Sequence, residues 1–337
     1  MITIKDIAKA TGYGMATVSK ALNDYPDISE KTKQIIKQKA RELNYIPNNM
    51  GRTLVTKSSF TIGVIFEETT DYGIAHPFFS EVLAKIKTTL EQNNYDILLI
   101  GKKVGEYVRS YLEHCIQKGV DGVIVVSKIW DKDNYDKLIN SKIPMVFIDH
   151  EEVNKNCVYT NSYDSIYHAV TYLYEKGHRN IAYIGGELDQ IVGKERYEGY
   201  VKALEDFNLS IYPRWYLYAE KYSFENAYNA VKKLLTSDVP KPTAIVASGD
   251  VMAIGAMKAI KEHGLKVPDD ISLIGFDNIR MAAYVSPALT TIAQSFEDLA
   301  KNACELLLTQ IKNNNATPKK IVVPSTLVER ESVKEIK

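Results

Sequence analysis

Cysteine is scarce in this chain, and long apolar runs are missing. The 337 residues include three cysteines, Cys115, Cys157 and Cys304, whose spacing gives neither a disulfide framework nor a zinc-ligand pattern. We expect them to be small buried apolar residues in a reducing cytoplasm. No stretch approaches the roughly 18 consecutive apolar residues of a membrane span, and the first residues do not resemble a secretory leader. The sequence therefore predicts a cytoplasmic protein with no membrane segment.

Motifs for catalysis and metal binding are also missing. None of the six histidines is followed by another four residues later, and there is no Gly-x-Ser-x-Gly nucleophile motif. The one dense polar cluster, Asp149-His150-Glu151-Glu152, could be a metal or acid–base site, but a solvated loop is the simpler interpretation. We predict that the protein is not an enzyme and has no metal site and no cofactor.

Charge is balanced over the whole chain but not along it. Lysine plus arginine and aspartate plus glutamate each number 42, yet residues 1–57 hold 10 basic and 5 acidic side chains. The remaining residues therefore carry a net charge of −5, against +5 for the first 57. A basic head on an acidic body suits a head that binds a polyanion, although an imbalance of this size can also arise by chance.

The first residues show the pattern of two short helices. Ile4, Ile7 and Ala8 recur at helical spacing after Thr3, a suitable N-cap, and Gly12 then interrupts the helix. A second apolar helical pattern follows at 16–22, which is typical of a helix-turn-helix but also of an ordinary helical hairpin. A third helix is predicted from Ser29, as N-cap, to about residue 43. The predicted core of this head is Ile4, Ile7, Val18, Leu22, Ile35 and Leu43.

From residue 60 onward, short apolar runs alternate with helical patterns. Strands are predicted at 61–66, 96–100, 122–126, 145–148, 181–184, 244–247 and 271–276. Helices are predicted near 78–93, 108–118, 163–176, 194–207, 224–236 and 251–263. Such alternation over about 230 residues predicts parallel sheets, and the length favours two sheets over one.

Several motifs have the order and spacing of a known family. In the head they are DIAKATGYGMATVSKALN, ISEKT and ELNYIPN; in the body they are HPFF (76–79), GVI (122–124), GHRNIAYIGG (177–186), RYEGY (196–200), AIGA (253–256), ISLIGFDN (271–278) and PALTTI (287–292). This set closely resembles the lactose/galactose repressor (LacI/GalR) family of bacterial transcription regulators, over nearly the whole chain. The resemblance implies an all-α helix-turn-helix head joined by a hinge helix to an α/β, two-lobed core like a periplasmic binding protein, with parallel sheets.

The resemblance also implies domain boundaries. The DNA-binding head is expected at 1–48, a hinge segment at 49–58, and an effector-binding and dimerisation core at 59–337. The core would divide into an N-lobe, about 59–160 and 290–320, and a C-lobe, about 161–289 and 321–332. No leucine-heptad tail follows residue 328, which favours a dimer over a tetramer.

A recognition helix would insert its exposed side chains into the major groove. Lys20 can donate to guanine, whereas Met15 and Ala16 can make only apolar contacts with bases. Phosphate contacts are expected from hydroxyl, amide and lysine groups, with one in doubt because the family usually has Ser where this chain has Gly14. The predicted DNA-binding residues are Thr3, Gly14, Met15, Ala16, Thr17, Ser19, Lys20, Asn23, Ser29, Thr32, Tyr45, Asn48 and Leu54. Leu54 occupies the family's minor-groove wedge position, although 49–56 could instead be a simple tether.

Ligands of open α/β sheets bind beyond the carboxyl ends of the strands. Glu67, Asp149, Asp250 and Asp277 follow predicted strands, and the resemblance assigns Arg196, Asp149 and Asp277 to the effector. The full predicted set is Glu67, His76, Phe78, Asp149, Arg196, Tyr222, Asp250 and Asp277. Guanidinium and carboxylate groups suit vicinal hydroxyls, so the predicted effector is a sugar. Two structural interpretations stay open: Asp277 and Arg196 could simply pair, and Glu67 could lie in a solvated loop.

These observations together predict a homodimeric repressor that binds a near-palindromic operator and is gated by a small carbohydrate. Within this class, the effector could instead be a purine or a protein corepressor. A sugar sensor that does not bind DNA, or an enzyme acting in the cleft, are the alternatives from other classes. The sequence does not distinguish an inducer from a corepressor.

Overall fold

The computed structural model describes residues 2–46, 58–67, 73–104, 106–126, 129, 131–189, 191–313 and 316–336. The chain divides into two compact units, Met1–Ser59 and Phe60–Lys337. The predicted hinge helix at 49–58, with Leu54, lies almost entirely outside the described residues, as does Asn48. In the described part of the chain, no helix combines the length and apolarity needed to cross a membrane.

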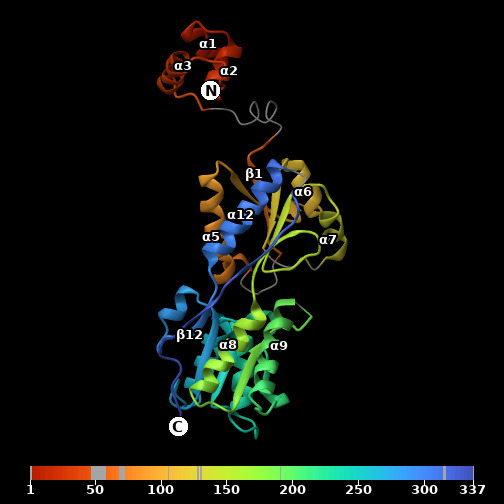
Figure 1. Ribbon diagram of the computed structural model, residues 1–337, viewed down its shortest axis with the longest axis vertical. Coiled ribbons are helices and arrows are strands. Elements are labelled where there is room, and N and C mark those ends of the chain that lie inside the picture. Colours follow the sequence, from red (N-terminus) through yellow and green to blue (C-terminus); the bar gives the residue numbers. More distant parts are fainter. Residues whose placement is uncertain are drawn as a thin grey trace. The chain divides into compact units, whose positions relative to one another are not determined.

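Unit 1 is a bundle of three helices, α1 (Ile4–Thr11), α2 (Met15–Leu22) and α3 (Glu30–Glu42) (Figure 1). Gly12 ends α1 with a left-handed φ of 74°, and its N–H donates to the carbonyl oxygen of Ala8 at 2.9 Å. Glycine suits this turn because it has no Cβ to clash at positive φ. The Ser29 hydroxyl caps α3 by accepting from the N–H of Thr32 at 3.2 Å.

The head has a small apolar core. Its fully buried members are Ile7, Val18, Ala21, Ile36 and Ala40. The prediction of Ile35 as a core residue is wrong, because its side chain is 42% exposed while that of Ile36 is completely buried. Helix α3 turns the face carrying Ile36 and Ala40, four residues apart, toward α1 and α2.

Unit 2 holds two six-stranded sheets, each covered by helices on both faces (Figure 1). Lobe 1 is built on the sheet with strand order β13-β7-β6-β5-β1-β2, in which every pairing is parallel. The strands are β1 (Thr61–Ile65), β2 (Asp96–Ile100), β5 (Gly122–Val125), β6 (Met145–Ile148), β7 (Asn156–Thr160) and β13 (Lys320–Val323). Helices α5 (Pro77–Gln92) and α12 (Phe296–Lys312) cover one face, and α6 (Tyr111–Lys118) and α7 (Lys132–Ile139) cover the other. The short elements are η1 (Gly73–Ala75), β3 (Lys103–Val104) and β4 (Tyr107–Val108).

Lobe 2 is built on the sheet with strand order β14-β12-β11-β10-β8-β9, in which only β14 is antiparallel. The strands are β8 (Ile181–Gly185), β9 (Tyr216–Tyr218), β10 (Ala244–Ala247), β11 (Ser272–Asp277), β12 (Thr290–Ala293) and β14 (Thr326–Val328). Helices α8 (Ser162–Glu175) and α9 (Ile191–Asp206) cover one face, and α10 (Phe224–Leu235) and α11 (Asp250–Glu262) cover the other. Three short 3-10 helices, η2 (Pro213–Trp215), η3 (Glu220–Tyr222) and η4 (Arg280–Ala283), complete the lobe.

The chain passes between the lobes three times: from β7 to α8, from β12 to α12, and from β13 to β14. The approximate lobe limits predicted from the sequence differ from these crossings by a few residues at two segments. Residues 290–293 form β12, which pairs with β11 in lobe 2, whereas the N-lobe was predicted to resume at about 290. Residues 321–323 pair with β7 in lobe 1, whereas the C-lobe was predicted to resume at about 321.

Candidate DNA-binding surface and effector pocket

Helix α2 presents an exposed face opposite its buried one. Met15 is 57% exposed, and Ala16 and Lys20 are also exposed, whereas Val18 and Ala21 are buried in the head core. Thr17 and Ser19 are half-buried at the edge of this face. Met15, Ala16, Ser19, Lys20 and Asn23 therefore lie along one side of α2, as a recognition helix requires.

Several predicted DNA-contacting groups already have partners within the head. Lys20 Nζ contacts Asp27 Oδ2 at 2.5 Å, and this bond lowers the pKa of Asp27. Thr3 donates to Asp6 Oδ2 from both its backbone N–H, at 2.9 Å, and its hydroxyl, at 2.7 Å. Any contact from these groups to a phosphate or base must therefore compete with an existing bond.

The other predicted DNA-contacting residues of the head differ in their surroundings. The side chains of Ser29 and Thr32 share a hydrogen bond of 2.9 Å at the start of α3, and Asn23 Nδ2 donates to the Ser19 carbonyl at 2.8 Å. Tyr45 packs partly buried against the head core instead of projecting from it. Gly14 is the N-cap of α2 with φ −65°, and a Cβ placed there would meet no atom closer than 4.0 Å.

Arg196 occupies the centre of the predicted effector site. It projects from α9 and is only 4% exposed. Its Nη1 donates to the carbonyl oxygen of Ser248 at 2.7 Å, its Nε donates to Ser162 Oγ at 3.3 Å, and its guanidinium lies 3.9 Å from the centre of the Phe276 ring. These contacts hold the cation within lobe 2, in a fixed orientation.

Two of the predicted carboxylates lie within the electrostatic reach of Arg196. Asp277 ends β11 at a φ of 105° and is 5% exposed; its Oδ1 accepts from Gln294 Nε2 at 2.8 Å. Burial raises the pKa of Asp277 to about 7, against the opposing effects of Arg196 and Gln294. Asp149 follows β6, and burial raises its pKa while Arg196 lowers it. The buried Oδ1 of Asp149 has no hydrogen-bond partner among the described residues. Asp277 forms no ion pair with Arg196 in the described part of the chain, so the simple pairing of the two is not observed.

Asp250 and Glu67 have structural partners. Asp250 is completely buried at the start of α11, where its Oδ1 accepts from Thr291 Oγ1 at 2.6 Å and its Oδ2 from the N–H of Ile279 at 2.8 Å. These bonds tie the segment after β11 to β12 and use both carboxylate oxygens. Glu67 forms an ion pair of 2.7 Å with Lys102. Neither side chain requires a ligand to explain its position.

The predicted aromatic residues differ in their surroundings. Tyr222 has a buried hydroxyl with no hydrogen-bond partner among the described residues, and its ring packs so closely that a Cβ on Gly186 would lie 2.6 Å from it. Phe78 is 5% exposed and belongs to the core of lobe 1. The neighbouring Phe79 is only half-buried, and its ring centre lies 5.5 Å from that of His76. Burial, with the charge of Arg196, lowers the pKa of His76 to about 4, so this imidazole is neutral at pH 7.

A small pocket lies where the two lobes meet. Lobe 1 contributes the segments after β6 and at the end of β7, and lobe 2 contributes the first turns of α9. The lining residues are Asp149, His150, Glu151, Tyr159, Thr160, Ile191, Val192 and Glu195. Among the described residues, no group of three or more His, Cys, Asp and Glu side chains could hold a metal ion.

Sequence reasoning missed three side chains of this region: Thr160, Glu195 and Gln294. Thr160 ends β7, so the strand-end rule that selected Asp277 would have found it had this strand been predicted; the same rule applies to Gln294, which follows β12. Glu195 directly precedes Arg196, but nothing in the sequence indicated that its side chain would line the pocket.

One ion pair bridges the lobes at their exposed rim. Arg280 of η4 contacts Glu81 of α5, with 2.7 Å between Nε and Oε1 and 3.4 Å between Nη2 and Oε2. Arg280 is largely exposed, so solvent weakens this pair. It nevertheless depends on the relative position of the two lobes.

Known proteins match the chain over its whole length. The family model for bacterial regulatory proteins of the lacI family matches residues 3–48, and a periplasmic binding protein-like domain matches residues 170–333. The HTH-type transcriptional repressor PurR of Pasteurella multocida is 35% identical over 338 residues, 99% of both chains. PurR of Haemophilus influenzae is 34% identical over 342 residues, 100% of both.

Solved structures of LacI family regulators share the fold of this chain. The Lac repressor dimer bound to operator and the anti-inducer ONPF superposes with a TM-score of 0.83 at 27% identity, covering 99% of both chains. A LacI family regulator from Enterococcus faecium with bound ribose superposes with a TM-score of 0.71 at 28% identity, covering 82% of this chain and all of that one. This chain belongs to the LacI family of bacterial regulatory proteins and is a DNA-binding transcriptional repressor, not an enzyme.

Proposed function

We propose that a small ligand bound between the lobes controls the affinity of this repressor for its operator, and that this ligand is a carbohydrate. The observation that carries the proposal is the setting of Arg196, a buried and oriented guanidinium with the carboxylates of Asp149 and Asp277 within its electrostatic reach. Fixed donors beside fixed acceptors suit the vicinal hydroxyls of a sugar. The Enterococcus faecium relative was solved with ribose, and another solved relative is a CelR–cellobiose complex.

In this proposal the repressor is a homodimer whose two heads read the half-sites of a near-palindromic operator. The ligand would change the angle between the lobes, because its contacts come from both. The Arg280–Glu81 pair supports this idea, since it joins the lobes and would be disturbed by such a rotation. Operator and ligand would then change each other's affinity by the same factor.

A thermal-shift screen of the full chain with sugars and purines tests the proposal. A carbohydrate at 100 times its Kd should stabilise the protein by about 2.7 kcal/mol. The shift should be lost in Arg196→Gln and Asp277→Asn but kept in Lys194→Ala, an exposed position on the same helix. A shift that survives both pocket substitutions would place the ligand elsewhere. Titrating operator DNA with and without the ligand then distinguishes an inducer from a corepressor.

A purine is the second candidate. The Tyr222 ring packs against Gly186, and a Cβ on Gly193 would lie 2.8 Å from its hydroxyl, which places this aromatic side chain beside the pocket residue Val192. The curated relatives are named PurR, and these names mention no carbohydrate. A thermal shift with purines and none with sugars would favour it. A response to neither would favour a protein corepressor.

A further inference from the structure

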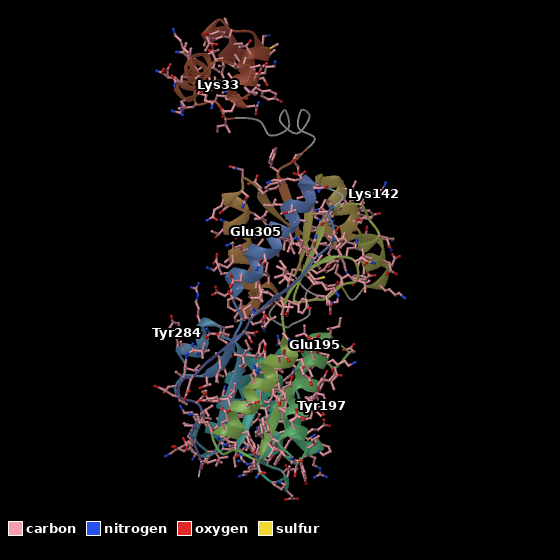
Figure 2. The ribbon with its side chains drawn as sticks, viewed as in Figure 1. Lys33, Lys142, Glu195, Tyr197, Tyr284 and Glu305 are labelled. Atoms are coloured by element: carbon pink, nitrogen blue, oxygen red, sulfur yellow. The ribbon has the colours of Figure 1, made fainter. Side chains whose placement is uncertain are left out.

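The inter-lobe pocket is acidic. Asp149 and Glu195 line it from opposite lobes, and Figure 2 shows Glu195 at the end of lobe 2 that faces lobe 1. The third carboxylate, Glu151, forms an ion pair with Lys320 of the same lobe. His150 lies 3.6 Å from Glu152, which provides a partner for its charge when the imidazole is protonated.

The cation beside this pair is partly engaged. Arg196 donates to Ser248 from Nη1 and to Ser162 from Nε, and its guanidinium lies over Phe276, so lobe 2 already uses part of its hydrogen-bonding capacity. It therefore offsets only part of the negative charge of Asp149, Glu195 and Asp277. Repulsion between the carboxylates affects Glu195. Burial raises the pKa of Glu195 most, and the charges of Asp149 and Glu151 raise it further.

Polar atoms in the same pocket lack partners among the described residues. Thr160 is 2% exposed and lines the pocket, and its Oγ1 has no hydrogen-bond partner; neither has Asp149 Oδ1. A buried carboxylate oxygen without a donor is costly, and a ligand that brings N–H groups recovers that cost. Ile191 and Val192 add apolar surface to the lining of the pocket.

We propose that this pocket takes a positively charged amino group of the effector between Asp149, Glu195 and Thr160, and that it rejects phosphorylated ligands. The inference rests on the proposed function, because it concerns the ligand of the same site, and it narrows the carbohydrate to an amino sugar. A phosphate would meet two carboxylates, and among the described residues the nearby cations Arg196 and Lys320 already have partners. A neutral sugar would offer Asp149 Oδ1 only a hydroxyl, which is a weaker donor than a charged amino group.

Calorimetric titration of the full chain with matched probes tests this. Glucosamine and glucose 6-phosphate each differ from glucose at one position, and ribose 5-phosphate differs from ribose at one position. We expect the amino sugar to bind about tenfold more tightly than its neutral counterpart, and the phosphates about tenfold more weakly than theirs. Glu195→Gln should abolish the preference for the amine, whereas Glu198→Gln, one turn along α9 and half exposed, should keep it.

The possible outcomes distinguish a failure of the amino-sugar inference from a failure of the proposed function. If phosphorylated probes bind as tightly as neutral ones, or if both glutamine variants change the preference equally, this inference is overturned and the proposed function stands. If none of the probes binds, the carbohydrate assignment fails, and the amino-sugar inference fails with it. Tighter binding of glucosamine that depends on Glu195 alone supports both.

Discussion

Replacing Asp277 by asparagine should change how the stability of the protein depends on pH. In the unfolded chain this carboxyl ionises near its ordinary pKa of 3.8, but in the folded protein burial raises the pKa to about 7. Between these values the unfolded chain releases a proton that the folded protein retains. The stabilisation is therefore complete below about pH 4 and is lost as the pH rises through 7. A difference of about 3 pKa units corresponds to about 4 kcal/mol.

Asparagine keeps the shape of the side chain and an oxygen that can accept from Gln294, but it does not titrate. We therefore expect Asp277→Asn to be more stable than the native protein at pH 8, and the advantage to shrink by about 3 kcal/mol between pH 8 and pH 4.5. Urea unfolding followed through Trp215, which is buried in lobe 2, measures this difference. The exposed Asp269→Asn is the control and should show the native pH dependence. A difference between Asp277→Asn and native protein that is constant across this range would refute the reasoning.

Three further predictions concern the head and the hinge segment. Gly12→Ala should destabilise it by about 1 to 2 kcal/mol because of the φ of 74°, seen as faster amide exchange in α1 and α2. The backbone of Gly14 can carry a serine, and a Cβ there would meet open space, so Gly14→Ser should change the stability by no more than a few tenths of a kcal/mol. In an anisotropy titration it should raise the affinity for operator about threefold to tenfold. An unchanged affinity would argue against a phosphate contact at this position. Leu54→Ala should weaken binding to operator by about tenfold or more and leave random DNA nearly unaffected at matched salt; equal losses on both would exclude the wedge.

The strands were largely predictable because they are short apolar runs buried on both faces. Every predicted run forms a strand, with bounds that differ by one residue at most. Strand β7 and the edge strands β9, β13 and β14 were not predicted. The edge strands have only three or four residues, which carry little periodicity, and their identity depends on a partner strand. Helix α12 was also missed, although Ser295 caps it and Leu299, Ala303 and Leu307 form a helical stripe.

Paired identical residues mark a limit of sequence reasoning. Ile35 and Ile36 are equally apolar, as are Phe78 and Phe79, and only packing decides which of each pair is buried. The same holds for the acidic residues. Asp250 and Asp277 both follow strands of lobe 2, and burial raises the pKa of both. Distant Thr291 and Ile279 bond both carboxylate oxygens of Asp250, whereas Asp277 lies within the electrostatic reach of Arg196.

The last strands of the chain lie at the edges of both sheets, and this has a consequence for synthesis on the ribosome. Strand β13 completes the sheet that β1 begins about 260 residues earlier, and β14 closes the edge of the other sheet. At translation rates of about 5 to 20 residues per second, lobe 1 waits roughly 15 to 50 s between its first and last strands. During that interval the exposed edges of β7 and β12 can pair with other nascent chains, so a product that stops before β13 should be prone to aggregation. Meanwhile the head, whose three helices are made of local contacts, can fold as soon as it leaves the exit tunnel.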